Sequence, residues 1–299
     1  MENRKALVIV LAYITVVLIW ATTPLTIKWS GEGVHYMFGI AARMTIGTAL
    51  ALLLVTWQHG KLNRDRKALQ AYLTVGLAIY AAMLPVYWAA QYIPSGLISV
   101  IFGLTPIMTA WFAAQLLQEQ RFGPNKIIGA LIGVAGVGVI FIRQINLGEH
   151  PAWGIGAVLF AVMVHSLSMV WIKKIKARVP ALTLTAGGLL VALPLLWVTY
   201  LLFAPPLPLE IPLRATMAII YLGVMGSVVG FVAYYFLLAE LPTSSTALIT
   251  LMTPVLAVLL GNWLNNEQSG IMVWSGTILV LSGLIVHQWG NRPSVKPIA

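Results

Sequence analysis

Cysteine is absent from this chain of 299 residues, and charge is scarce. The first absence excludes disulfides, thiolate metal sites and cysteine nucleophiles. Only 9% of the residues are charged, whereas 60% are apolar and the mean hydropathy is +0.90. A soluble domain carries charge on about a quarter of its residues, so this chain has too few charges to cover a water-facing surface. Lipid must take the place of water around most of it.

Acidic residues are the scarcer class of charge, and none lies at the centre of an apolar run. The eight Asp and Glu residues all fall at the ends of the runs or between them. Proton- and sodium-coupled carriers commonly place carboxylates at mid-membrane, and permanently cationic drugs tend to need a buried anion. The absence argues against a carboxylate-coupled multidrug pump and favours a uniporter or facilitated exporter. Coupling through His165 stays open.

Basic residues give the chain a net charge of +10. Such a balance can indicate nucleic-acid binding, but here the cations form short clusters between apolar runs, where an anionic inner leaflet would meet them. We therefore expect a lipid bilayer and no nucleic acid among the partners.

The first apolar run starts at Ala6 and resembles a signal peptide. It continues past Trp20 without a small-residue cleavage site, so it predicts a transmembrane helix.

Ten apolar runs are long enough to span a bilayer, which takes roughly 20 helical residues. They cover approximately 6–28, 34–58, 69–91, 94–117, 125–143, 151–173, 181–203, 212–238, 243–265 and 270–290. The fold class predicted is an all-α polytopic membrane protein. With a cytoplasmic N-terminus, fourteen Lys and Arg residues fall inside, and only Lys28, Arg143 and Arg214 fall outside. The bias predicts that both termini are cytoplasmic, in a plasma membrane of the bacterial inner type.

The second half of the chain echoes the first. Tyr87 to Gln120 aligns with Tyr235 to Gln268 at an offset of 148 residues, which matches Pro94 with Pro242, Pro106 with Pro254 and Glu119 with Glu267. We therefore predict two five-helix domains, 1–148 and 149–299. Because five is odd, the two copies enter the membrane from opposite sides, and inverted repeats are typical of transporters. A duplication that only builds a stable bundle is the alternative.

These features resemble one known family. Ten spans in two halves, with the segments Pro94 to Glu119 and Pro242 to Glu267 each ending in a Glu before the next helix, are similar to the EamA-type branch of the drug/metabolite transporter superfamily. Relatives export amino acids, other metabolites or cationic drugs. The resemblance implies a basket-like bundle whose central cavity is lined mainly by helices 1, 3, 4, 6, 8 and 9. It also suggests the aromatic amino-acid exporters as a subgroup.

Two ionisable residues lie inside predicted spans, where burial is costly and usually functional. Arg43 could pair with a substrate carboxylate, or it could anchor backbone carbonyls structurally. His165 could line the cavity and hydrogen-bond a substrate, or it could bridge two helices. Deep aromatic residues suit a cavity that binds planar or apolar groups, with ordinary helix packing as the alternative. The aromatic candidates are Trp20, Tyr80, Tyr87, Trp88 and Tyr235.

Prolines inside spans remove helix hydrogen bonds and favour kinks. Pro24, Pro106 and Pro254 are candidate hinges for gating, or simple kinks.

The fifth span carries glycines at 129, 133, 136 and 138, and the tenth carries Gly276 and Gly283. Small residues at such spacing permit close helix contact, so we assign both sets to packing or dimerisation.

Together these patterns predict a transporter that exports small organic metabolites, first of all amino acids with aromatic or other apolar side chains, by alternating access. Proton-coupled transport of drugs, sugars or nucleobases is the nearest alternative. A membrane-embedded lipid-modifying enzyme or an assembly protein is the alternative from another class. No motif for phosphate binding, zinc binding or a catalytic triad is present. We expect no enzyme activity, cofactor or metal, and a monomer or homodimer.

Overall fold

The computed structural model describes residues 2–59, 61–117, 124–144, 151–206, 210–241, 249–267 and 270–289. Within these ranges every regular element is a helix. The first half of the chain forms α1 (Glu2–Trp29), α2 (Tyr36–His59), α3 (Arg66–Ala89), α4 (Ser95–Phe102), α5 (Thr105–Leu116) and α6 (Pro124–Gln144). The second half forms α7 (Pro151–Ile175), α8 (Ala181–Phe203), α9 (Leu213–Tyr221), η1 (Leu222–Val229), α10 (Gly230–Glu240), α12 (Ile249–Asn265) and α13 (Ile271–Trp289).

Helical residues occupy all ten predicted spans, but not all are equally suited to cross a bilayer. Seven stretches in the described residues are long and apolar enough: 6–29, 36–58, 66–89, 95–116, 151–175, 181–203 and 213–238. The apolar parts of α6 and α13 are shorter. The chain is thus an all-helical, multi-pass membrane architecture. That ten helices cross, and that the halves are inverted, stays a prediction. Glu119, Pro242 and the domain boundary at 148 lie outside the described residues.

The fourth predicted span is two helices rather than one. α4 ends at Phe102, a short turn follows, and α5 begins at Thr105. Pro106 therefore lies in the first turn of α5. A backbone N–H at that position would have no partner within the helix, so proline costs no hydrogen bond there. The sequence had suggested instead that Pro106 lies inside one kinked helix. Thr105 donates its hydroxyl to the carbonyl of Phe102 at 2.6 Å and closes the turn. By contrast, Pro24 and Pro254 do lie inside α1 and α12.

The eighth span contains a π-helical segment that the sequence does not announce. α9, η1 and α10 run continuously, and η1 carries the wider i→i+5 turn over 222–229. Ser227 reinforces that turn by donating its hydroxyl to the carbonyl of Leu222, five residues earlier, at 3.0 Å. Segments of this kind are rare and are frequently found at functional sites.

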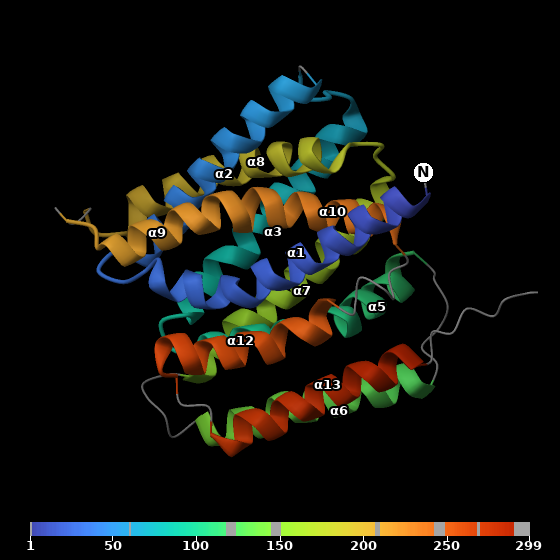
Figure 1. Ribbon diagram of the computed structural model, residues 1–299, viewed down its shortest axis with the longest axis vertical. Coiled ribbons are helices and arrows are strands. Elements are labelled where there is room, and N and C mark those ends of the chain that lie inside the picture. Colours follow the sequence, from blue (N-terminus) through green and yellow to red (C-terminus); the bar gives the residue numbers. More distant parts are fainter. Residues whose placement is uncertain are drawn as a thin grey trace, which may run out of the picture.

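The helices form one main group and one outlying pair (Figure 1). In the main group α3 packs on α7 and α8, α2 packs on α8 and η1, and α1 packs on α12 and α10. The pair consists of α6 and α13, which lie side by side below α12 in the view of Figure 1 and make most of their contacts with each other. A helix from each half of the chain thus forms this pair.

Glycines set the close approach of α6 and α13. A Cβ on Gly283 would lie 2.5 Å from the carbonyl oxygen of Gly129 and 2.6 Å from the nitrogen of Gly133. A Cβ on Gly136 would lie 2.7 Å from the carbonyl oxygen of Gly276. Gly129, Gly133 and Gly136 of the predicted set in α6 therefore face Gly276 and Gly283 of α13 within one chain, backbone against backbone.

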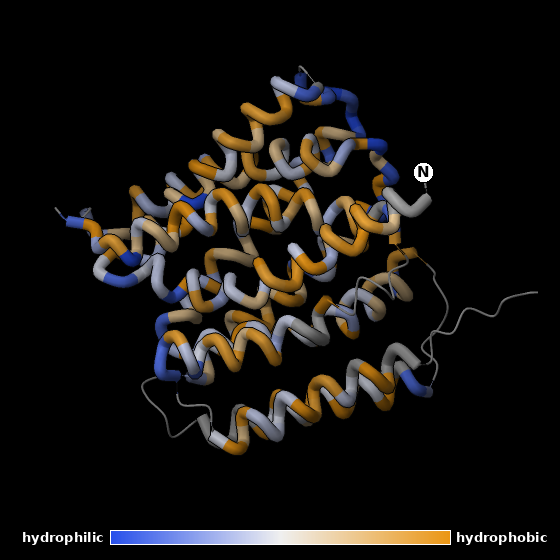
Figure 2. Tube along the Cα trace, viewed as in Figure 1, coloured by the Kyte–Doolittle hydropathy of each residue, from blue (hydrophilic) through white to orange (hydrophobic). Residues whose placement is uncertain are grey.

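Apolar residues predominate along the helices, and hydrophilic residues gather mostly at their ends (Figure 2). Leu201, Phe203 and Leu213 are each more than 70% exposed, as are Trp57 and Trp263. Apolar exposure on this scale would be a liability in water, whereas it is what a bilayer requires. Four of the cations predicted to lie inside are at the junction of α2 and α3: Lys61 and Arg64 in the connection, and Arg66 and Lys67 in the first turn of α3.

Asp65 caps α3 at that end. Its Oδ1 accepts a hydrogen bond from the backbone N–H of Ala68 at 2.6 Å, and this bond holds the pKa of the Asp65 carboxyl below its usual 3.8. A lowered folded-state pKa adds stability that is present above the usual value and is lost as the pH falls through the folded one.

Asp65→Ala should therefore lower the melting temperature at neutral pH, because the N–H of Ala68 loses its partner. The difference from the unsubstituted protein should be constant between pH 8 and 5 and should shrink below about pH 4. Thermal unfolding in detergent over this pH range measures it. Asp65→Asn, which still caps but carries no ionisable group, should stay close to the unsubstituted protein between pH 8 and 5. A pH-independent deficit in Asp65→Ala would contradict the ionised cap.

Candidate functional site

A cavity of about 130 Å³ lies in the main helix group, between the two halves of the chain. Its described lining comes from α1, α2, α3, α4, α5, α7, η1, α10 and α12, and α6, α8 and α13 contribute none of it. In span numbering these are helices 1, 3, 4, 6, 8 and 9, as the family resemblance implied, with helix 2 added through Arg43. The lining includes Pro24 and Gly226, and its polar and aromatic members are Trp20, Thr23, Arg43, Ser99, Phe102, Thr105, His165, Ser168, Phe231, Tyr234, Tyr235 and Thr253.

Of the predicted site residues, Trp20, Arg43, His165 and Tyr235 line this cavity, and so does the candidate hinge Pro24. Three predicted residues of α3 do not. Tyr80 hydrogen-bonds the hydroxyl of Thr199 on α8 at 2.8 Å, and Trp88 packs against Tyr92 with ring centroids 4.9 Å apart. Tyr87 is buried outside the lining, where its hydroxyl accepts a hydrogen bond from Nη1 of Arg43.

The physical reason is the helical phase of α3. The face that α3 turns to the cavity carries residues 75, 78, 79, 82, 83 and 86, at the i, i+3, i+4 spacing of one helix stripe. Tyr80 and Tyr87 share a neighbouring stripe, which packs on α2 and α8. Pro106 and Pro254 also lie outside the lining, although Thr105 and Thr253, which precede them, belong to it.

Among the lining residues that the structure describes, Arg43 alone carries a permanent charge. Its side chain is only 2% exposed. Its Nε donates to the Ser227 hydroxyl at 2.9 Å, and its Nη1 donates to the Tyr87 hydroxyl at 3.3 Å. Neither partner is anionic, and the ion pairs found among the described residues do not involve Arg43. Burial of a charge without a counter-charge is costly, so the guanidinium offers an attractive place for an anionic group.

The π-helical segment shapes the space around this guanidinium. η1 presents Ser227 to Nε and leaves Gly226 as bare backbone beside the other end of the side chain. A Cβ on Gly226 would lie 3.1 Å from Nη2 of Arg43. Ser227 thereby orients the guanidinium, and the preceding residue, Gly226, leaves room for it.

Aromatic rings form the wall contributed by α1, α7 and α10. The ring of Trp20 lies 4.5 Å from that of Tyr234, and Tyr234 lies 5.8 Å from Tyr235 and 6.3 Å from His165. Phe102 completes the cluster 6.2 Å from His165. Tyr234 was missed as a site residue. Its position next to Tyr235 gave no phase information, because adjacent helical residues point about 100° apart.

Hydroxyl groups were also missed, and two of those in the lining are turned back on their own helices. Thr23 donates to the carbonyl of Ile19, and Ser168 donates to the carbonyl of His165. No Asp or Glu belongs to the lining that the structure describes. No group of side chains suited to a metal ion occurs in the described ranges either. The site therefore offers one cation, aromatic faces and hydroxyls.

Comparison with known proteins identifies the family. The EamA-like transporter family matches residues 7–142 and 152–287, most of the chain in two consecutive stretches. The chain belongs to the EamA-like transporter family. It is a membrane transporter, as its relatives in this drug/metabolite transporter superfamily are named.

The EamA-family relatives are similar over nearly their whole length. "Uncharacterized transporter YoaV" of Bacillus subtilis is 23% identical, covering 93% of this chain and 96% of the relative. "Probable terminal-alkyne amino-acid exporter" of Streptantibioticus cattleyicolor is 25% identical, covering 93% and 92%. "Uncharacterized inner membrane transporter YedA" of Escherichia coli is 24% identical, covering 100% and 98%. A solved crystal structure shares the EamA-family fold at TM-score 0.68 and 23% identity, covering 93% of this chain and 97% of that one.

Proposed function

We propose that this protein exports amino acids with aromatic or other apolar side chains across the bacterial inner membrane, by alternating access and without an obligatory coupling ion. The observation that carries this proposal is the central cavity. It combines one unpaired guanidinium, a cluster of aromatic rings and no carboxylate among its described lining, and both halves of the chain build it.

The helix contacts support two inverted repeats. Helices at the same span position in the two halves are counterparts: α1 and α7, α2 and α8, α3 and the span containing η1, and the span of α4 and α5 and that of α12. When each helix is exchanged for its counterpart, the contact of α1 with α12 becomes that of α7 with α5. The contact of α3 with α8 becomes that of η1 with α2. The contacts α2–α8, α4–α12 and α6–α13 map onto themselves. With five spans per half, such a two-fold relation lies in the membrane plane, and ten spans cross the bilayer. Two equivalent units in opposite orientation can open one central site to each side in turn.

We further propose that both termini face the cytoplasm. The end of the bundle where α2 meets α3 and α7 meets α8 is also the end where α1 begins, and it carries most of the described cations. The opposite end, which we term the outer end, carries Lys28 and Arg214. This distribution follows the positive-inside rule.

An amino acid fits the chemistry of the cavity in one orientation. Its carboxylate would face Arg43, and its side chain would lie against Trp20, Tyr234 and Tyr235, where stacking favours an apolar or planar group. The cavity volume of about 130 Å³ lies below the roughly 300–1,000 Å³ of drug-sized sites, which favours a small metabolite over a drug. One similar protein carries the name of an amino-acid exporter.

Proteoliposomes containing the purified protein test this function. We expect saturable counterflow of radiolabelled phenylalanine and leucine, of equal rate with and without a pH gradient, and no counterflow of lysine or glucose. Trp20→Ala should raise the half-saturating concentration by about tenfold, because an aromatic contact contributes roughly 0.5–1.5 kcal/mol beyond its buried area. Trp153→Ala, at a residue that is 66% exposed and does not line the cavity, is the matched control and should leave the half-saturating concentration unchanged. Absence of amino-acid counterflow under any gradient would overturn the substrate assignment.

A further inference from the structure

Glu267 joins three helices at the outer end of the bundle. Its Oε1 lies 3.3 Å from Nζ of Lys28, at the end of α1, and accepts from Nδ2 of Asn265 at 3.0 Å. Its Oε2 accepts from both the backbone N–H and the hydroxyl of Ser95, at 3.0 and 2.9 Å. Ser95 is the first residue of α4, so the carboxylate also meets the positive end of that helix. The Glu267 side chain is only 7% exposed.

These contacts lie one helical turn beyond the central cavity. Lys28 directly follows Ile27, a lining residue of α1, and Ser95 precedes the lining residue Ser99 of α4 by four positions. Four residues are about 6 Å of helix. Glu267 therefore ties α1 to α4 across the outer end of the cavity, and it belongs to the half of the chain that contains neither helix.

A second layer of contacts covers the first. Trp29 donates its Nε1–H to Oδ1 of Asn265 at 3.0 Å, and the guanidinium of Arg214 lies 4.3 Å above the Trp29 ring. Arg214 also pairs with Glu32 at 3.3 Å. The ring and the N–H of Trp29 both belong to this network, which joins α1, α9 and α12.

α1 is weakened directly below Lys28. Pro24 has no N–H to donate to the carbonyl of Trp20. Thr22, Thr23 and Thr26 each donate their hydroxyl to a carbonyl three or four residues earlier in α1, at 2.6–3.1 Å. Threonines bonded in this way destabilise a helix slightly and often bend it. The last two turns of α1 are therefore the segment of this helix that bends at least cost.

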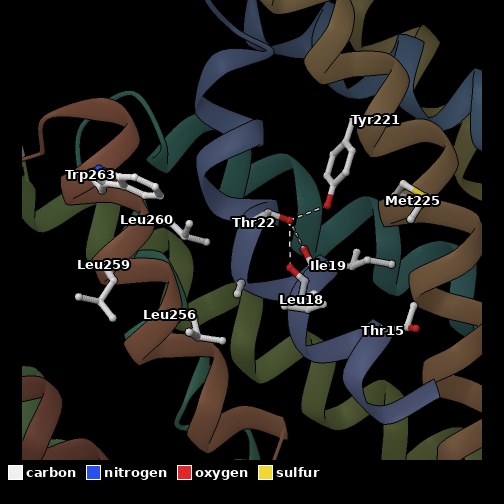
Figure 3. Close-up of a pocket in the computed structure, with 11 residues that line it drawn as sticks. Thr15, Leu18, Ile19, Thr22, Tyr221, Met225, Leu256, Leu259, Leu260 and Trp263 are labelled. Atoms are coloured by element: carbon white, nitrogen blue, oxygen red, sulfur yellow. Dashed lines mark hydrogen bonds between the residues drawn. The ribbon is translucent and has the colours of Figure 1, made fainter. Parts of the chain in front are cut away.

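A groove beside this segment leaves room for movement. It lies between α1, α9, η1 and α12, with a volume of about 620 Å³. Its largely apolar lining includes Leu18, Leu256, Leu260 and Met225 (Figure 3). Among the described lining residues, the hydrogen bond that crosses the groove is the one between the hydroxyls of Thr22 and Tyr221, at 2.6 Å. Fluid acyl chains from the bilayer can leave such a space, whereas packed protein could not. α1 thus separates this groove from the central cavity.

From these observations we propose that Glu267 is the gating residue of the outer end: its carboxylate holds α1, α4 and α12 closed over the cavity, and its release lets the outer part of α1 bend at Thr22–Thr26 into the groove. The proposal rests on the alternating-access cycle proposed above. The contacts suit a reversible closure, because the Lys28 side chain is 33% exposed and water can replace the protein partners one at a time.

The lack of native cysteine allows a direct test. Ser99→Cys places a single thiol in the cavity, and a membrane-impermeant maleimide applied outside intact bacterial cells reports how often the outer end opens. With Glu267→Gln added, the labelling rate should rise about tenfold, a shift of ~1.4 kcal/mol between closed and open states. Lys28→Gln, which removes one contact of four, should give a smaller rise. Glu210→Gln, the same change at an exposed residue of that end, should give none.

Labelling needs no substrate, so its outcome is independent of whether amino acids are transported. Equal rates in Glu267→Gln and Glu210→Gln, in proteins of normal melting temperature, would reduce Glu267 to a static cap of α4 and overturn the proposal. Should Glu267→Gln fail to fold, an unchanged rate in Lys28→Gln would overturn it instead. A rise seen only from the cytoplasmic side, in inside-out vesicles, would overturn the assignment of this end to the outer face.

Discussion

Counterflow of phenylalanine should fall about 100-fold in Arg43→Gln. The guanidinium is buried and held by Ser227 and Tyr87, so it is already oriented when a carboxylate arrives. Hydrogen bonds to charged groups contribute roughly 1.5–3 kcal/mol, and the upper part of this range corresponds to a factor of about 100. Arg43→Lys should lose about tenfold, because one ammonium group cannot bond both protein partners and the substrate in the same geometry.

Phenethylamine, which lacks the carboxylate, separates substrate binding from structural anchoring. The unsubstituted protein should prefer phenylalanine, and Arg43→Gln should abolish this preference while retaining its folded yield. Ser227→Ala is the companion variant: it removes the Nε partner but keeps the charge, so it should weaken the preference without eliminating it. An equal loss for both compounds in Arg43→Gln would show that Arg43 only anchors α2 to η1 and α3.

Gly283→Ala should destabilise the protein more than any substitution of similar size elsewhere in α13. The new methyl group would meet the carbonyl oxygen of Gly129 and the nitrogen of Gly133 within 2.6 Å, and backbone cannot rotate away as a side chain can. Forcing atoms into a close-packed interface costs about 1–3 kcal/mol. Gly136→Ala, 2.7 Å from the carbonyl oxygen of Gly276, should behave alike. Melting temperatures in detergent measure both.

Gly138→Ala is the matched control, two residues further along the same helix. A Cβ at this position meets nothing within 4 Å. Alanine is the better helix former by about 0.5–1 kcal/mol, so this variant should melt at the same temperature or slightly higher. Should Gly136→Ala and Gly138→Ala melt alike, the glycine contact would not be what holds α6 against α13.

Hydropathy was sufficient to place the helices, because a run of some 20 apolar residues needs no partner to be recognised. The interruptions within the helices, by contrast, depend on contacts with other residues. Thr105-Pro106 is visible in the sequence, but whether the chain kinks there or stops and restarts depends on the turn that Thr105 closes with Phe102. Nothing in residues 222–229 distinguishes a π segment from an α-helix in the sequence, and the bond from Ser227 to the carbonyl of Leu222 becomes visible only in the fold.

The candidate site was predictable where chemistry alone is informative. Arg43 and His165 stand out as ionisable groups in apolar runs, and both line the cavity. Tyr80 and Tyr87 were misplaced because spacing tells which residues share a stripe but not which way the stripe faces. Glu267 and Lys28 were interpreted only as residues at span ends. They lie 239 positions apart, and only the fold reveals that they meet.

The wider turn of η1 also fixes the rotational register of α10, the next helix along the chain. A π segment accommodates one residue more than an α-helix does over the same length, and each residue turns a helix by about 100°. Deleting one residue between 222 and 229 would restore α geometry and rotate α10 against everything upstream. Either Arg43 would lose its hydrogen bond to Ser227 or Trp20 would lose its ring contact with Tyr234. The two contacts could no longer form at the same time. One surplus residue thus aligns the charged and the aromatic sides of the cavity.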